Sequence, residues 1–332
     1  MTEGTAQDAD FRGRRVLISS FRNEAPFVLE FVAHHRVLGF DEIIIASNDC
    51  TDGTSDILDA LDRAGAIRHL PCVPPPRISP QAHAYQQIRQ AFPVDAADWL
   101  MILDADEFLN IHVGAGRLSD LIAAQDDADL VLVNWACFGS DGHDRWRDEP
   151  TTTRFLHRMR TLAGEAHVKT LIRSPARWQT LSNHHPFGWT GRGKVRLSFA
   201  AGVWHEEVPG KDVTFGAYRD VKPTVGTFRI AQVNHYATRT ADSFALRRAR
   251  GRGAAPQSGK NSRHDETYFN RMSRGSFPDD TITRYAPEVS ALMAKWRADP
   301  AINRAEAEGI RLYQAEIDRY WQARNAAEGE PQ

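Results

Sequence analysis

The sequence has no apolar run long enough to cross a membrane. In its 332 residues, every such run is interrupted well before the roughly 18 residues that a spanning helix needs. Residues 1–15 are polar and do not resemble a secretory signal. Cysteine is scarce as well: Cys50, Cys72 and Cys137 have no metal-ligand spacing and cannot all pair, which predicts reduced thiols. We therefore expect a cytoplasmic protein without a transmembrane segment.

An excess of positive charge is also missing. The chain has 41 Lys and Arg against 43 Asp and Glu, a net charge of −2, so nucleic acid is not an expected partner. A composition that is 42% hydrophobic and 25% charged is typical of one large globular domain or two smaller ones. Residues 1–14 are expected to be disordered. The segment 247–263, rich in Gly, Ser and Arg, predicts a mobile solvated loop and allows peripheral membrane contact.

Glycine-rich phosphate-binding motifs are absent too. A dinucleotide-binding unit places G-x-G-x-x-G after its first strand. Here the first predicted strand runs into SSFRNEAP (residues 19–26), which contains no glycine. The pattern G-x-x-x-x-G-K-[ST] does not occur either. These absences exclude both of the common glycine-loop nucleotide sites.

What is present is an alternation of apolar runs with helical patterns. Pro26 suits the first turn of a helix that Gly39 ends, and Thr51 or Asp52 is expected to cap the next helix, which begins near Thr54. Such alternation predicts an α/β fold with a mostly parallel sheet flanked by helices. The predicted strands are 15–20, 42–47, 67–71, 99–103 and 130–140, with helices between them at 23–39, 54–64 and 81–92. Residues 150–235 are expected to be α+β, and two helices close the chain, at 284–296 and from about 302.

Three acids follow the predicted strand 99–103. Asp104 and Asp106 in LDADEF lie two residues apart, so in an extended chain they point to the same side. Paired carboxylates at the carboxyl end of a strand suit Mg²⁺ or Mn²⁺. The alternative is that they cap the following turn or face water. Asp-Ala-Asp occurs twice more, at 8–10 and 127–129, but only in a polar tail and before a strand.

Two further polar loops follow neighbouring strands. One is ASNDCTDGT (46–54) and the other is SSFRNE (19–24). Because the carboxyl ends of parallel strands share one edge of a sheet, the three loops predict a binding cleft there. The ligand-binding side chains expected from these two loops, which would bind the donor of the reaction considered below, are Arg22, Asn23, Glu24, Asn48, Asp49 and Asp52.

With these residues in place, the chain resembles glycosyltransferases of the family 2-like kind, in the branch close to family 92. The matching pieces are RNEAPFVLEFVAHHRVLGFDEIIIASNDCTDGT, LDADEF, VNWACFGSDGH, VKTLIRS and VNHYATRTADSF. The resemblance implies the GT-A fold. It also implies a nucleotide-sugar-binding half (15–140), an acceptor-binding half of the same domain (141–245), and a basic loop with C-terminal helices (246–332).

The resemblance also implies the reaction and its participants. It would be a metal-dependent, inverting transfer from a nucleoside diphosphate sugar to a glycan, lipid-linked or small-molecule acceptor. Asp106 would be the principal ligand of Mn²⁺ or Mg²⁺, and Asp104 would contact the ribose or the metal. His235 in VNHY matches a further metal or diphosphate ligand, with a structural histidine as the alternative. A UDP-sugar is the favoured donor.

Departures from the family pattern leave some roles open. Ser47 stands where relatives commonly carry aspartate, so Asn48 or Asp49 would recognise the base, and uridine, guanosine or another nucleoside remains open. Arg77, after the triple proline, is a candidate contact for the base or the diphosphate.

The second half of the chain supplies candidates for the acceptor side. Asp141 is the first choice for the catalytic base, with His143, Asp144 and Glu165 as rivals; the alternative is that Asp141 is a turn residue beside Gly142. For the acceptor we expect His184, His185 and Trp189 in NHHPFGW, with Trp135 as another stacking surface or, like Trp189, a core residue.

Two other functions are compatible with these motifs. A phosphatase or phosphotransferase of the haloacid dehalogenase kind also uses Asp-x-Asp after a strand, but normally after the first strand, with Thr or Val where this chain has Phe108. A non-catalytic sugar-binding or scaffold protein could retain the same fold.

Overall fold

The computed structural model describes residues 13–125, 127–160, 167–200, 205–212, 228–251 and 265–328. Its strands are β1 (Arg15–Phe21), β2 (Glu42–Ser47), β3 (Arg68–Pro71), β4 (Trp99–Ile102), β5 (Glu107–Ile111), β6 (Leu130–Cys137), β7 (His157–Arg158), β8 (Val168–Arg173), β9 (Trp178–Thr180), β10 (Phe187–Trp189), β11 (Lys194–Phe199), β12 (His205–Pro209), β13 (Ala231–His235) and β14 (Phe277–Pro278). Its α-helices are α1 (Val28–Leu38), α2 (Thr54–Arg63), α3 (Pro80–Ala91), α4 (Leu118–Ala123), α5 (Thr151–Arg154), α6 (Ala241–Arg250), α7 (Glu266–Met272), α8 (Ala286–Arg297) and α9 (Pro300–Glu328).

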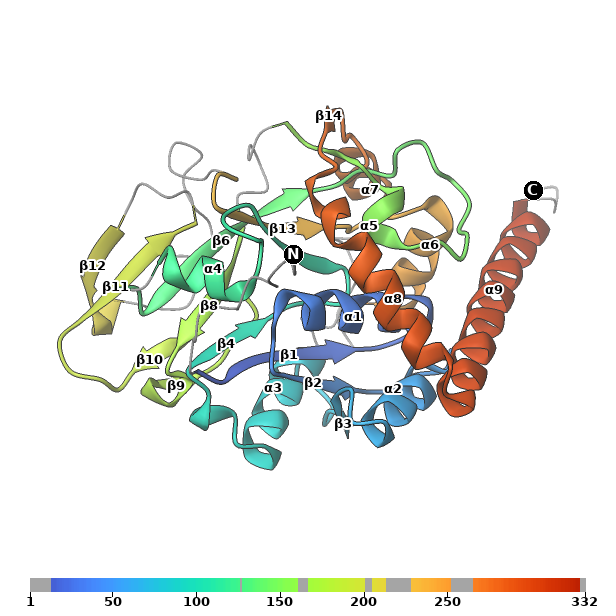
Figure 1. Cartoon of the computed structure of the whole chain (residues 1–332). Coiled ribbons are helices and arrows are strands. Elements are labelled where there is room, and N and C mark those ends of the chain that lie inside the picture. The colour runs from blue at the N-terminus through green and yellow to red at the C-terminus, as the bar shows by residue number, and fades with distance from the viewer. Residues whose placement is uncertain are drawn as a thin grey trace, which may run out of the picture.

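A mixed, mostly parallel sheet runs through the middle of the molecule (Figure 1). Its order in the described residues is β12-β11-β6-β8-β4-β1-β2-β3, and β13 joins β6 and β5. β1 is parallel to both β2 and β4, so these three strands end at the same edge. β8 lies antiparallel between β4 and β6.

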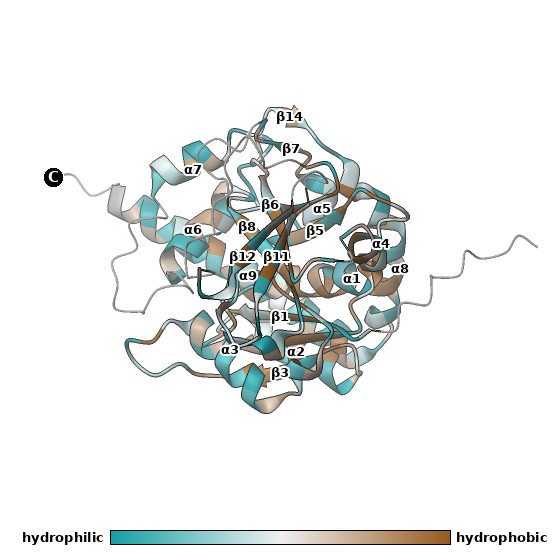
Figure 2. Ribbon diagram, turned by 90° about the vertical axis from the view of Figure 1, so that its left-hand side faces the viewer, coloured by the Kyte–Doolittle hydropathy of each residue, from teal (hydrophilic) through white to brown (hydrophobic). Residues whose placement is uncertain are grey.

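Each face of the sheet packs on its own core, because successive side chains of a strand point to opposite faces. In β1, Leu17 and Phe21 join the core under α1, α2 and α8, whereas Val16 and Ile18 join the core under α3. Figure 2 shows the resulting arrangement, with hydrophobic strands between helices whose outer surfaces are hydrophilic. Both faces of β1, β2 and β4 are therefore buried, which explains their continuous apolar runs.

The fold class predicted from the sequence is confirmed. The strand predicted at 42–47 is β2, and Gly39 ends α1 in the left-handed conformation with φ 102°. Two details are wrong. The helix expected from Pro26 begins as a 3₁₀ turn (Ala25–Phe27) and becomes α1 only at Val28. The N-cap position of α2 is Gly53 at φ 84° and not Thr51 or Asp52, although the Asp52 carboxylate accepts a hydrogen bond from Thr54 N in the first turn.

The C-terminal helices pack against the first half of the chain. α8 lies on α1, and α9 lies along α2 and α6 (Figure 1). Tyr313 and Ile317 of α9 pack on Phe27, as their helical spacing predicts. Gly309 allows a close approach, since a Cβ atom there would lie 2.9 Å from Ala25 Cβ and 3.4 Å from the Asp52 carbonyl oxygen.

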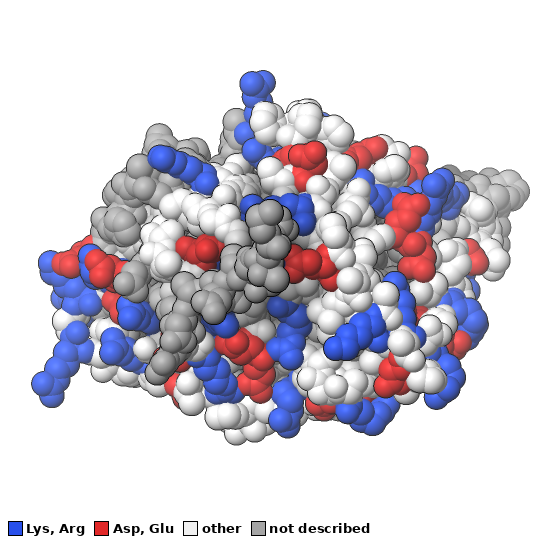
Figure 3. Space-filling model, viewed as in Figure 1, with Lys and Arg blue, Asp and Glu red and all other residues white. Residues whose placement is uncertain are grey.

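Basic and acidic side chains are interspersed over the face shown in Figure 3. None of the described helices is both long and apolar enough to span a bilayer. Residues 1–12 of the predicted disordered tail and residues 252–264, which include most of the predicted basic loop, lie outside the described residues. The start of that loop was predicted wrongly, because residues 247–250 form the last turn of α6.

Candidate active site

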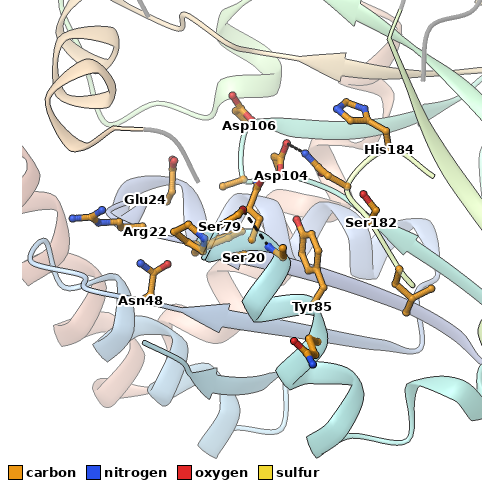
Figure 4. A pocket seen from close by; sticks show the side chains of 18 of the residues that line it. Ser20, Arg22, Glu24, Asn48, Ser79, Tyr85, Asp104, Asp106, Ser182 and His184 are labelled. Carbon is orange, nitrogen blue, oxygen red and sulfur yellow. Dashed lines mark hydrogen bonds between the residues drawn. The ribbon is translucent and has the colours of Figure 1, made fainter. Parts of the chain in front are cut away.

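An open cavity of about 800 Å³ lies at the edge where β1, β2 and β4 end. The loops after these strands form one side, the first turns of α3 form the floor, and residues 179–187 with α6 complete the wall (Figure 4). The structure thus brings together seven of the residues that the sequence singled out. These are Arg22, Glu24, Asn48, Asp104, Asp106, His184 and His235.

Asp106 is the most deeply placed of the cavity carboxylates. Its side chain is 6% exposed, and its Oδ2 lies 3.5 Å from Nε2 of His235, the last residue of β13. The same oxygen accepts a hydrogen bond from Nη1 of Arg247 in α6. Burial disfavours the charged carboxylate, but Arg247 and His235 outweigh it and hold the pKa of Asp106 well below its usual range.

Asp104 has a different set of partners. Its Oδ1 accepts a hydrogen bond from Gln81 Nε2 at 2.6 Å, and its Oδ2 accepts from Lys169 Nζ at 3.1 Å and from Asn183 Nδ2 at 3.3 Å. The two aspartates share the cavity, but in the described residues no group of three or more His, Cys, Asp or Glu side chains has the geometry of a metal site. Asp104 is therefore held by protein donors, and Asp106 pairs with His235.

Lys169 and Glu107 form a buried ion pair beneath Asp104. Lys169 Nζ lies 2.8 Å from Glu107 Oε2, and neither side chain is exposed. Burial, opposed by Lys169 and reinforced by Asp104 and Asp106, raises the pKa of Glu107 to about 8. Sequence reasoning assigned neither residue a role, although a lysine inside the apolar strand VKTLIR was a signal.

The cavity wall contains buried polar atoms without a partner in the described residues. They include Tyr85 Oη and Gln81 Oε1 of α3, Arg22 Nε, Trp135 Nε1 and His235 Nδ1. A buried polar atom without a hydrogen bond is costly, and atoms of this kind around an open cavity are positioned to meet a polar ligand. The α3 side of the cavity was missed from the sequence, where only Arg77 was chosen from that region.

Seven of the predicted site residues do not line the cavity: Asn23, Asp49, Asp52, Arg77, Asp141, His185 and Trp189. Four of them, Asn23, Asp49, Arg77 and Asp141, have positive φ angles between 47° and 75°. Such angles mark tight turns, which Asn and Asp tolerate best.

Asp52 and Asn23 hold two of the predicted loops together. Asp52 is fully buried; its Oδ2 accepts from Ala25 N at 2.9 Å, and its Oδ1 accepts from Thr54 N at 3.0 Å. Asn23 exchanges two hydrogen bonds with Thr51, at 2.8 and 3.0 Å. Because its oxygens accept from backbone N–H groups, Asp52 does not face the cavity. It fixes the positions of the two loops that line the cavity.

Asp141 also bonds to protein groups away from the cavity. Its Oδ2 accepts from Leu156 N at 2.6 Å and lies 3.1 Å from His157 Nδ1. Among the rival bases, His143 and Asp144 are exposed outside the cavity, and Glu165 lies outside the described residues. The position of Asp141 matches the turn-residue alternative.

The aromatic residues divide between core and cavity. Trp189 packs on Trp178 at a centroid separation of 4.9 Å, whereas Trp135 lines the cavity with His184. The Trp135 ring lies 4.0 Å from the His235 ring and 5.5 Å from the His184 ring, centroid to centroid. His185 is buried, 1% exposed.

Ser47, at the end of β2, joins a chain of hydrogen bonds. Its Oγ lies 2.8 Å from His69 Nε2, and His69 Nδ1 lies 2.6 Å from Asp59 Oδ1. The imidazole of His69 thus connects the partly exposed Asp59 carboxylate to the end of β2.

Comparison with known proteins supports the resemblance drawn from the motifs. No protein-family model matches the chain. A glycosyltransferase family 92 protein of Oryza sativa subsp. japonica is 27% identical over 171 residues, which cover 49% of this chain and 28% of that protein. The chain is therefore similar to family 92 glycosyltransferases over about half its length, and the match spans little more than a quarter of the relative.

Two solved structures are distantly similar to this chain. The mannosyltransferase PcManGT from Pyrobaculum calidifontis, in complex with GDP-Man and Mn²⁺, has a TM-score of 0.38 at 14% identity, covering 99% of this chain and 92% of that one. S. aureus TarS 1–349 has a TM-score of 0.35 at 14% identity, covering 93% of this chain and 92% of that one.

Proposed function

We propose that this protein is a glycosyltransferase that moves a sugar from a nucleoside diphosphate donor to a saccharide, lipid-linked or small-molecule acceptor. The observation that carries the proposal is the pairing of Asp106 with His235 in a cavity formed by the loops after β1, β2 and β4. The similarity to a family 92 glycosyltransferase supports the same activity. In this proposal the boundary at residue 140 divides the donor half from the acceptor half, and the boundary at residue 245 ends the acceptor half.

The residues present fit a divalent cation that the donor helps to hold. Asp106 Oδ2 and His235 Nε2 lie 3.5 Å apart, and Mg²⁺ sites commonly combine one or two protein ligands with substrate phosphates. Asp106 and His235 would hold Mn²⁺ or Mg²⁺, and Asp104 would contact the ribose. When bound, the ion would stabilise negative charge on the departing nucleoside diphosphate as a Lewis acid.

The nucleoside would lie between the ends of β1 and β2 and the start of α3. Arg22, Asn48 and Tyr85 line this part of the cavity, and the unpartnered Arg22 Nε and Tyr85 Oη supply polar atoms for the base, the ribose or the sugar. A UDP-sugar is our first candidate for the donor.

The acceptor would lie on the side of His184 and Trp135. His184 Nδ1 is 2.9 Å from the carbonyl oxygen of Val168, and since a carbonyl only accepts, Nδ1 carries the proton. Nε2 is then the basic nitrogen. It would accept the hydrogen bond, and in an inverting reaction the proton, of the attacking hydroxyl. The described cavity carboxylates are less suited, because Glu24, Asp104 and Asp106 each pair with a Lys or Arg.

Isothermal titration calorimetry with UDP, GDP, ADP and CDP, each with and without Mn²⁺, tests the proposal. A transferase binds at least one nucleotide only with the metal. Steady release of phosphate from monoesters would instead favour the phosphatase, and saccharide binding without any nucleotide binding would favour the scaffold protein. Slow hydrolysis of one sugar nucleotide without acceptor would then identify the donor.

A further inference from the structure

Arg247 of α6 occupies the side of Asp106 that faces the cavity. Its Nη1 donates hydrogen bonds both to Asp106 Oδ2 and to the carbonyl oxygen of Ala237, the latter at 2.9 Å. The Arg247 side chain is 23% exposed, whereas that of Asp106 is 6% exposed. The carboxylate therefore meets the cavity largely through this guanidinium group.

The guanidinium group competes with a metal ion for one oxygen atom. Asp106 Oδ2 is the atom closest to both His235 Nε2 and Arg247 Nη1. A divalent cation bound between Asp106 and His235 would share that oxygen with a hydrogen-bonded cation, and like charges at such short range repel each other strongly. Occupation of this oxygen by Arg247 therefore weakens metal binding, and metal binding in turn weakens the hold of Asp106 on Arg247.

Arg250 fixes the end of α6 at the rim of the cavity. Its Nη1 donates to the carbonyl oxygens of Arg22 and Asn23, and its Nη2 donates to Glu24. Because the backbone of α6 is anchored one turn away, the Arg247 side chain can change partner while its helix stays in place. Arg247, Arg250 and Gly251 all line the cavity.

We propose that Arg247 is an exchangeable cation, which neutralises Asp106 in the empty site and transfers to the donor diphosphate when a metal ion takes its place. The inference rests on the proposed function and assigns a positioning residue to it. The guanidinium fork matches phosphate oxygens, and the only change is an exchange of ionic partners. No covalent bond forms or breaks in this step.

The exchange couples metal binding to donor binding. Without a donor, the metal must displace Arg247 from Asp106, which weakens its binding. With a donor, the displaced guanidinium gains the diphosphate as a partner. By linkage, nucleotide and metal then strengthen each other's binding by the same factor.

The test measures Mn²⁺ affinity by electron paramagnetic resonance, first without nucleotide and then with saturating UDP or GDP. Arg247→Met keeps the bulk of the side chain and removes its charge. Without nucleotide we expect this variant to bind Mn²⁺ at least tenfold more tightly than the original protein. At saturating Mn²⁺ we expect its nucleotide affinity to fall at least tenfold. Arg248→Ala, a change at the exposed neighbouring residue, should match the original protein in both measurements.

Arg247→Lys provides a second variant in case loss of the charge prevents folding. Lysine retains a cation beside Asp106 but lacks the fork, so Mn²⁺ binding without nucleotide should stay weak while nucleotide binding falls. Mn²⁺ affinity that is unchanged in a folded Arg247→Met variant would overturn the exchange and leave the transferase proposal standing. If the original protein binds no nucleotide with metal, both proposals fail.

Discussion

The ammonium group of Lys169 lies 2.8 Å from Glu107 Oε2 and 3.1 Å from Asp104 Oδ2, so one buried cation serves two carboxylates. Glu107 is wholly buried, whereas the Asp104 side chain is 21% exposed and faces the cavity. Lys169 thus connects the interior of the sheet to the floor of the candidate active site. A change at Lys169 should therefore have a larger effect on the stability of the fold than on any single contact with a ligand.

Lys169→Met should lower the free energy of unfolding by about 3–5 kcal/mol, because it removes the cation that the buried Glu107 shares with the partly exposed Asp104. Urea denaturation measures the change. Lys295→Met, at an exposed position of α8, should stay within about 0.5 kcal/mol of the original protein. Equal stabilities for the two variants would mean that Lys169 does not neutralise these acids.

Asp106→Asn should abolish the metal-dependent part of nucleotide binding, since an amide binds a hard dication much less well than a carboxylate. The amide oxygen still accepts the hydrogen bond from Arg247, so the variant should fold. Calorimetry with Mn²⁺ and the preferred nucleotide measures the loss. Asp129→Ala, in the Asp-Ala-Asp sequence that precedes β6, should bind nucleotide normally; full nucleotide binding by Asp106→Asn would remove Asp106 from the metal site.

Tyr85→Phe should weaken donor binding about fivefold to tenfold, the effect of losing one ordinary hydrogen bond. It should not lower the melting temperature, because Tyr85 Oη has no partner in the described residues. Titration of the donor nucleotide or sugar nucleotide, together with a thermal melt, separates the two effects. Unchanged donor affinity would show that the hydroxyl does not contact the ligand.

Gly309→Ala should destabilise the protein by about 1 kcal/mol or more through overpacking. In an unhindered helix the same change would instead stabilise by up to about 1 kcal/mol. The added Cβ would lie 2.9 Å from Ala25 Cβ and 3.0 Å from Ile57 Cδ1. Ala307→Gly, at an exposed position of the same helix, measures the difference in helix propensity between alanine and glycine without a change in packing. A more stable Gly309→Ala variant would contradict the tight packing of α9 against Ala25 and Ile57.

Stability should fall in mild acid because of His34. Burial lowers the pKa of His34 from 6.5 to about 4, although its Nε2 contacts the Leu109 carbonyl oxygen at 2.8 Å. Between these pH values His34 stays neutral in the folded state, whereas in the unfolded state it binds a proton. The contribution of the neutral His34 to the free energy of unfolding is therefore full at pH 7 and is lost as the pH falls toward 4. Between pH 7 and pH 5 this loss amounts to about 2 kcal/mol. His35, whose pKa is also lowered by burial and by His34, adds to the effect.

His34→Gln is the matched variant, because its amide can donate to the same carbonyl oxygen and does not titrate. Urea denaturation at pH 7, 6 and 5 should give a smaller fall in unfolding free energy than for the original protein. An identical pH dependence in both would show that His34 is not the group responsible.

The sequence predicted local features well where one residue type has one structural consequence. Gly39 could end a helix because glycine adopts positive φ at little cost, and the strand before Asp104 was evident from its apolar residues. The approach of His235 to Asp106 depends on β13 pairing with β6 and β5, a long-range contact that no local pattern contains.

The predicted site residues that do not line the cavity share another cause. Asp52 and Asp141 have the chemistry of a site residue and lie in loops, but backbone N–H groups of Ala25 and Leu156 occupy their oxygens. A carboxylate that satisfies a turn and one that meets a ligand have the same local sequence. Lys169, by contrast, was overlooked because its acids come from a different strand, β5, and from the loop before it.

The contact of Gly309 with the Asp52 loop has a consequence for biosynthesis. The N-terminal strands are synthesised first, yet the turn between β2 and α2 packs on α9, a helix that follows every described strand in the sequence. A nascent chain that has produced β1, β2 and β4 therefore still lacks the helix that supports this turn. Stalled or shortened chains that end before α9 should form much of the sheet but bind nucleotide poorly.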